Sequence, residues 1–150
     1  MANQAKAIVI YGSTTGNTEA LSEEVVKGLR NGGMEVTVMD VRKAAVNKLA
    51  DFELIVLGCS TWDEGELQDD FVEFYNAMSK EYFEGKKTAV FGPGDSESYP
   101  DYFCEAVVMI EKKLRECNAE IIAESLKIDG DIEPALGEAQ SWGLDIAKAF

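Results

Sequence analysis

The sequence predicts an α/β fold: a three-layer α/β/α sandwich built around a five-stranded parallel sheet. Strand-like and helix-like patterns alternate five times along the 150 residues, which favours a parallel sheet with right-handed crossovers and helices on both faces. Two of the strands are continuous apolar runs, a pattern typical of parallel strands buried on both sides. The chain has the usual length of one domain, so we expect a single domain over residues 1–150.

The five expected strands differ in their degree of burial. The first and third consist almost wholly of apolar residues and are therefore expected in the interior of the sheet. The second alternates Val36 and Val38 with polar neighbours, so it should be less buried. In chain order the strands are expected at Ala7–Tyr11, Glu35–Asp40, Leu54–Cys59, Thr88–Gly92 and Glu120–Ile128.

The helices follow from apolar residues at helical spacing. In the first helix Leu21, Val25 and Leu29 recur at i, i+4 and i+8, and Gly32-Gly33 ends the helix. The connection after the second strand has less of this pattern and is interpreted as a short helical crossover. In chain order the helices are expected at Thr18–Asn31, Val41–Asp51, Gln68–Ser79, Tyr102–Cys117 and Glu133–Phe150.

The loop after the first strand is the main candidate for ligand binding. It contains only Gly, Ser, Thr and Asn, and it leads directly into a helix, whose first backbone N–H groups attract anions. It lacks the lysine of a G-x-x-x-x-G-K-S/T loop, so it suits a phosphate that is held and not transferred. The alternative is an ordinary capped helix start. The candidate residues are Ser13, Thr14, Thr15, Gly16, Asn17 and Thr18.

Aromatic residues occupy the two other loops expected at the same edge of the sheet. Trp62 follows the third strand, and Tyr99 and Tyr102 follow the fourth. In parallel sheets ligands bind beyond the carboxyl ends of the strands, so these loops should converge with the phosphate-binding loop. Two aromatic faces suit a flat ring system between them. Alternatively, Trp62 covers an edge of the core and Tyr99 is a single surface aromatic.

Composition excludes several classes of function. The chain has no histidine and no C-x-x-C motif, which argues against Ser-His-Asp or Cys-His catalysis and predicts no metal site. Its net charge of −14 would repel nucleic acid and anionic membranes. The acidic surface serves solubility or attracts a basic partner. Three cysteines, no membrane-length apolar run and no signal-peptide pattern lead us to expect a cytoplasmic protein.

Four segments of the sequence resemble those of flavodoxins, in particular the short-chain type of anaerobic sulfate-reducing bacteria. The segments are Tyr11–Glu19, Leu57–Trp62, Glu66–Phe71 and Tyr102–Cys104. The resemblance covers essentially the whole chain and implies strand order 2-1-3-4-5, with the ligand at the switch point. It also implies an electron carrier with non-covalently bound FMN, and not an enzyme.

The resemblance assigns roles to residues. Ser13 to Thr18 would bind the FMN phosphate, Ser60 and Thr61 would approach the ribityl chain, and Trp62 would be the inner stacking face. Tyr99 is expected to be the outer stacking face, with Tyr102 as the alternative. Asp63 stands where the best-matched members of the family carry glycine. The pyrimidine edge would meet Gly94, Asp95, Tyr102 and Cys104, with Phe103 adjoining.

The resemblance also implies partners and a redox range. Acidic residues on the two aromatic loops should lower the reduction potential of a flavin and attract basic partners: c-type cytochromes, hydrogenases or ferredoxin-linked oxidoreductases. A monomer is expected. The alternative function is an FMN-dependent NAD(P)H:quinone-type reductase of the same fold. This chain lacks the acidic cluster that a response-regulator receiver would need. It also lacks the Cys-x5-Arg motif that a low-molecular-weight phosphatase would need.

Overall fold

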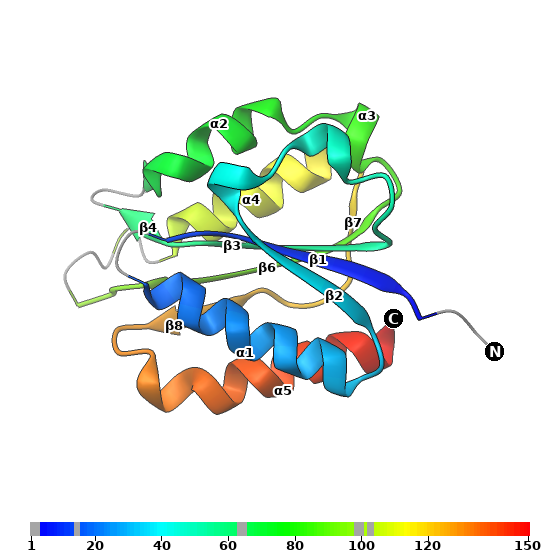
Figure 1. Cartoon of the computed structure of the whole chain (residues 1–150). Helices are drawn as coiled ribbons and strands as arrows, with labels where there is room; N and C mark the ends of the chain where they lie inside the picture. The colour runs from blue at the N-terminus through cyan, green and yellow to red at the C-terminus, as the bar shows by residue number, and fades with distance from the viewer. Residues whose placement is uncertain (1–3, 14–15, 63–65, 98–100, 102–103) are drawn as a thin grey trace.

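The computed structural model describes residues 4–13, 16–62, 66–97, 101 and 104–150, with only the backbone of Trp62. A parallel sheet divides the molecule into layers (Figure 1). Hydrogen-bonded neighbours follow the order β2-β1-β3-β6, and the last two strands both pair with β6. The strand order 2-1-3-4-5 is thereby confirmed. The sheet strands are β1 (Lys6–Gly12), β2 (Glu35–Asp40), β3 (Leu54–Cys59), β6 (Lys87–Gly94), β7 (Glu120–Ile121) and β8 (Leu126–Asp129).

The fifth expected strand is interrupted. β7 pairs with the start of β6 and β8 pairs with its end, so residues 122–125 leave the ladder between them. The indole N–H of Trp142 donates to the carbonyl oxygen of Glu124 at 2.9 Å, which provides this carbonyl with a partner outside the sheet. The sequence of the strand does not reveal this interruption, because Trp142 lies 18 residues further along the chain.

Helices cover both faces of the sheet (Figure 1). Alternate residues of β1 point to opposite faces: Ala7 and Val9 join a core with the first and last helices, and Ile8 and Ile10 join a core with the others. None of the described helices has the length and apolarity needed to cross a bilayer. The face to which Ala7 and Val9 point carries α1 (Asn17–Asn31) and α5 (Leu136–Ala149). The face to which Ile8 and Ile10 point carries α2 (Asp69–Ala77), α3 (Lys80–Phe83) and α4 (Glu105–Glu116).

The prediction of a helical crossover over Val41–Asp51 was wrong. The segment contains two 3-10 turns, η1 (Val41–Lys43) and η2 (Val46–Lys48). The Asp40 carboxylate accepts the backbone N–H of Arg42 at 2.9 Å, which favours a tight turn at this point. Ala44 and Ala45 between the turns are extended, so no continuous helix can form.

Other boundaries also differ from the sequence-based expectation. The helix expected over Gln68–Ser79 ends at Ala77, and α3 follows separately. The helix expected from Tyr102 begins at Glu105, because Cys104 has a left-handed φ of 52°. A short antiparallel ribbon, β4 (Thr61–Trp62) with β5 (Glu66–Leu67), follows β3 and was not expected. A final 3-10 turn, η4 (Glu133–Ala135), leads into α5.

Helices α1 and α5 pack closely through glycine. A Cβ on Gly28 would lie 2.1 Å from the carbonyl oxygen of Gln140, and a Cβ on Gly143 would lie 2.4 Å from that of Val25. Both distances are far below van der Waals contact, so each helix approaches the backbone of the other where side chains are absent.

Candidate functional site

The carboxyl ends of β1, β3 and β6 lie side by side at one edge of the sheet. Gly12 is in register with Cys59, and Gly58 is in register with Phe91. The loops that leave these strands therefore start next to one another, as the sequence predicts for a site at the strand ends. The start of β1 and the C-terminus lie toward the opposite edge (Figure 1).

The loop after β1 presents the first amides of α1. The hydroxyl of Ser13 accepts the N–H of Gly16 at 3.0 Å, and Gly16 precedes the helix with a φ of 91°. The first intrahelical bond runs from Ala20 N–H to the Gly16 carbonyl, so the N–H groups of residues 17–19 are not used by the helix. No side chain caps α1 within the described part of the chain. Thr14 and Thr15 lie outside the described residues.

Thr18 provides a test of whether this loop fits a phosphate. Its side-chain oxygen is buried, and no hydrogen-bond partner for it exists among the described residues. Buried hydroxyl groups nearly always have a partner. Asn17 and Gly16 beside it are exposed, and a Cβ on Gly16 would have nothing within 4 Å. An anion with several oxygens, such as a phosphate monoester, would bind both the hydroxyl and the free helix amides.

The loop after β3 is attached to the start of α4. Ser60 and Thr61 are both half-buried, and the Thr61 hydroxyl accepts the backbone N–H of Ala106 at 2.9 Å. Thr61 therefore satisfies one of the free amides of α4, a structural role that the sequence did not reveal. Trp62 lies in β4, where its backbone pairs with Glu66. The Trp62 side chain and Asp63 lie outside the described residues.

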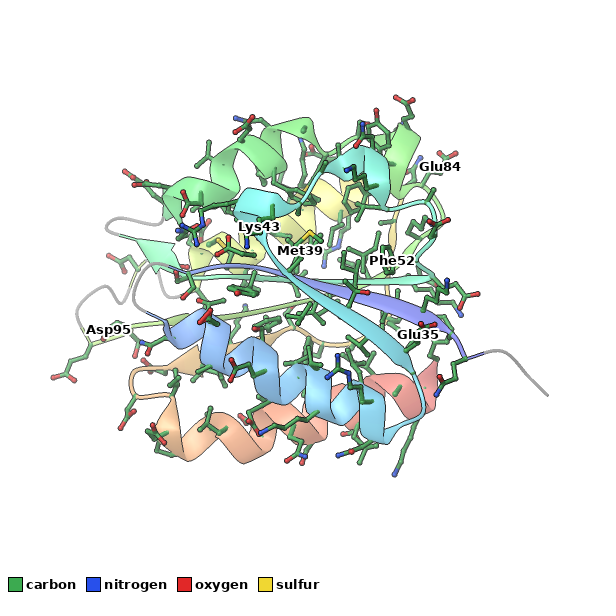
Figure 2. All side chains as sticks on the ribbon, in the orientation of Figure 1. Glu35, Met39, Lys43, Phe52, Glu84 and Asp95 are labelled. Atoms are coloured by element: carbon green, nitrogen blue, oxygen red, sulfur yellow. The ribbon has the colours of Figure 1, made fainter. Side chains whose placement is uncertain are left out.

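The segment after β6 is bound to the end of β8. The backbone N–H of Ser96 donates to Asp129 at 3.0 Å, and the Ser96 hydroxyl donates to the other oxygen of the same carboxylate. Gly94, half-buried, accepts the N–H of Gly130 at 2.8 Å. Asp95 between them points into solvent (Figure 2). Sequence reasoning missed Ser96 and Asp129, since 33 residues separate them and no local pattern links them.

Three of the expected residues belong to the remainder of this loop. Tyr99, Tyr102 and Phe103 lie outside the described residues, so the outer stacking face stays a prediction. Cys104, at the end of the loop, is fully buried, and its thiol lies 3.5 Å from the carbonyl oxygen of Gly92. The loop thus returns to the β6 strand from which it left.

The cysteines at this edge are not nucleophiles. Burial raises the pKa of Cys59 and that of Cys104 to about 12. A thiol with such a pKa is almost entirely protonated at neutral pH, and the thiolate is the reactive form. Neither of these two thiols therefore supplies a thiolate for covalent catalysis.

Carboxylates surround this edge of the sheet. Asp69 and Asp70 occupy the first turn of α2, directly after β5, and both are exposed. The amide of Gln68 donates to Asp70 at 2.9 Å and holds that carboxylate against the helix start. Glu97 and Asp101 are exposed on the loop after β6. Together with Asp95, these four carboxylates give the edge a strongly negative surface.

Comparison with known proteins identifies the family. The flavodoxin family model matches residues 9–142. The chain is 44% identical over 146 residues to the flavodoxin of Maridesulfovibrio salexigens, covering 95% of this chain and 97% of that protein. It is 40% identical over 149 residues to that of Nitratidesulfovibrio vulgaris, covering 97% and 99%.

Solved structures agree with the sequence relatives. Oxidised flavodoxin 2 from Bacillus cereus superposes with a TM-score of 0.88 at 32% identity, over 97% of this chain and 100% of that one. None of these relatives supports the alternative of a quinone-type reductase. The family match, the strand order and the arrangement of the loops lead to one conclusion: the chain belongs to the flavodoxin family.

Proposed function

We propose that this flavodoxin is a single FMN-binding domain over residues 1–150 that carries electrons at low potential between redox proteins, and that it is not itself an enzyme. The observation that carries the proposal is the buried Thr18 hydroxyl beside the free amides of α1. A neutral set of donors that satisfies a phosphate is what a tightly held, uncleaved FMN requires. When bound, FMN supplies the one- and two-electron redox chemistry.

Different residues at the carboxyl edge of the sheet bind different parts of FMN. Ser13, Gly16 and Thr18, with the loop residues between them, hold the phosphate through backbone N–H and hydroxyl groups. Ser60 and Thr61 approach the ribityl chain, and Gly94 and Asp95 approach the pyrimidine edge with Cys104. Trp62 and Tyr99 stack on the ring and exclude water, with Tyr102 as the alternative to Tyr99. Asp63 and Phe103 complete the set of contacts.

The exposed carboxylates set the redox range. Asp69, Asp95 and Asp101 are exposed at this edge, and a carboxylate near the ring opposes the addition of negative charge to it. Because about 1.4 kcal/mol corresponds to about 59 mV for one electron, several such charges lower the potential markedly. Replacing these three and Asp63 together by asparagine should raise the potential of the second reduction step.

The same carboxylates favour basic redox partners. A net charge of −14 attracts c-type cytochromes, or basic patches on hydrogenases and ferredoxin-linked oxidoreductases. Electron transfer to such a partner should slow as salt increases, because salt screens the attraction. The three cysteines are free and buried, which suits a monomer in the reducing cytoplasm.

The proposal is tested with the purified chain. We expect a yellow protein that releases FMN on acid treatment and takes it up again with quenching of flavin fluorescence. Riboflavin, which lacks the phosphate, should bind much more weakly if the α1 loop holds that group. The protein alone should not oxidise NAD(P)H in the presence of quinones, whereas it should pass electrons to a basic cytochrome. A colourless protein that does not take up FMN contradicts the proposal.

A further inference from the structure

Asp129 connects two segments of the candidate site that are far apart in sequence. It is the last residue of β8, where it stands in register with Gly94 of β6. Its side chain reaches beyond that partner to Ser96, two residues further along. One carboxylate oxygen accepts the backbone N–H of Ser96 at 3.0 Å, and the other accepts the Ser96 hydroxyl.

A backbone hydrogen bond strengthens this connection. Directly after Asp129, Gly130 adopts a left-handed φ of 72° and donates its N–H to the Gly94 carbonyl at 2.8 Å. Asp95 lies between the two attached residues, and its carboxylate accepts the N–H of Glu97 at 3.1 Å. Three hydrogen bonds besides the local turn therefore hold residues 94–97, and the exposed carboxylate of Asp129 accepts two of them.

An exposed segment needs such attachment to keep one conformation. Residues 95–97 have left the sheet, so the ladder no longer holds their backbone. Ordering each free residue costs conformational entropy. Charge-assisted hydrogen bonds are the strong ones, and here both oxygens of one carboxylate act on one residue. Ligand binding is tighter when the contacting backbone is already ordered.

We propose that Asp129 is a positioning residue whose carboxylate, through Ser96, holds the Gly94–Asp95 backbone in the conformation that receives the flavin ring. The inference rests on the proposed function, because Gly94 and Asp95 are the residues expected at the pyrimidine edge. Asp129 contributes by ordering this segment before the ligand arrives. A purely electrostatic role, in which its charge acts on the ring at a distance, is the competing explanation.

Two substitutions separate these explanations. Asp129→Ala removes both acceptors and the charge. Asp129→Asn removes the charge, yet its amide can accept the Ser96 N–H and donate to the Ser96 hydroxyl. Positioning predicts that Asp129→Ala raises the dissociation constant for FMN about tenfold, whereas Asp129→Asn raises it less than about threefold. An electrostatic role predicts that the two variants change together. Asp131→Asn is the matched control, since that carboxylate accepts the Glu133 N–H instead.

Hydrogen exchange in the FMN-free protein gives a second readout. The amides of Ser96 and Gly130 should lose protection in Asp129→Ala and keep it in Asp131→Asn. Ser96→Ala tests the same contact from the other side, and the double variant should bind FMN no more weakly than Asp129→Ala alone.

Each outcome decides one question. If the unmodified chain binds FMN and Asp129→Ala binds it equally well, the inference is overturned and the proposed function stands. Parallel changes in Asp129→Ala and Asp129→Asn also overturn it. Failure of the unmodified chain to bind FMN contradicts the proposed function, and the exchange experiment still shows whether Asp129 orders the segment.

Discussion

Tyr11 donates its phenolic hydrogen to a carboxylate oxygen of Glu19, and the two oxygens lie 3.1 Å apart. Tyr11 belongs to the end of β1 and Glu19 to the first turn of α1, so this bond joins the two elements on either side of the loop that we propose to bind phosphate. Partial burial of Tyr11, followed by the hydrogen bond to Glu19 and its negative charge, raises the pKa of Tyr11 to about 12.

This bond predicts a loss of stability at alkaline pH. The pKa of Tyr11 is about 12 when folded and about 10 when unfolded. Between these values the unfolded chain releases the proton first, so stability falls as pH rises; below the lower value the contribution is complete. Tyr11→Phe should show a smaller decrease in unfolding free energy than the unmodified chain over this interval, measured by urea unfolding.

Glu19→Gln provides the control for the cause of the raised pKa. Glutamine keeps an acceptor for the phenol but removes the charge, so the pKa of Tyr11 should fall toward its ordinary value. Titration of tyrosinate absorbance measures it. An unchanged titration curve in Glu19→Gln would show that the charge of Glu19 does not contribute to the raised pKa.

Thr18→Val should weaken FMN binding without destabilising the protein. Valine has nearly the same shape, and the hydroxyl that it replaces is buried with no partner in the described part of the chain. Removing that hydroxyl leaves the stability of the FMN-free protein unchanged or slightly higher. The dissociation constant for FMN should rise about tenfold, while that for riboflavin should stay the same.

Ser22→Ala is the matched control for this experiment. Ser22 is also buried in α1, but its hydroxyl donates to the Glu19 carbonyl at 2.7 Å. We expect a loss of about 1 kcal/mol in the free energy of unfolding and no selective effect on FMN over riboflavin. If Thr18→Val and the unmodified chain bind FMN with equal affinity, Thr18 does not contact the phosphate.

Gly28→Ala should destabilise the protein although alanine is the better helix former. The propensity difference favours alanine by about 1 kcal/mol, but the new Cβ would lie 2.1 Å from the Gln140 carbonyl oxygen and force α1 and α5 apart. Such overpacking costs about 1–3 kcal/mol or more. Gly137→Ala, where a Cβ meets nothing within 4 Å, should instead be stabilising. Thermal unfolding of the two variants compares the signs, and stabilisation by both would contradict the close helix contact.

Lys86→Met should lower stability and leave FMN binding unchanged. The Lys86 ammonium donates to three backbone carbonyls, those of Leu49 at 3.3 Å, Ala50 at 3.1 Å and Phe52 at 2.8 Å. Phe52 lies at the edge of the sheet opposite Asp95 (Figure 2). Methionine keeps the apolar stem and removes the donors, so we expect a loss of about 2 kcal/mol in urea unfolding.

Lys48→Met is the control for the change in net charge. Lys48 is exposed, so its replacement should change stability by less than about 0.5 kcal/mol. If both variants lose the same amount, the effect comes from charge and the three carbonyl contacts contribute little.

Local sequence patterns and the family resemblance were enough to predict the fold class and the strand order, and they singled out the Gly/Ser/Thr loop after β1 as the candidate phosphate site. These follow from local patterns: apolar runs such as Leu54–Cys59, which is buried throughout, and a Gly/Ser/Thr loop directly before a helix. The prediction of a helical crossover over Val41–Asp51 was wrong because the hydrogen bond from Arg42 N–H to Asp40 favours a tight turn. Hydrophobic periodicity carries no information on such bonds.

Which distant residues meet is evident from the packed structure and not from the sequence. Three contacts join residues that are far apart in the chain: Asp129 with Ser96, Gly28 with Gln140, and Trp142 with the interruption of the last strand. Sequence periodicity describes which face of an element is buried, but it carries no information on which side chain or carbonyl lies opposite. That choice arises when the layers pack together, since close packing and the pairing of buried polar groups select among the arrangements that the pattern allows.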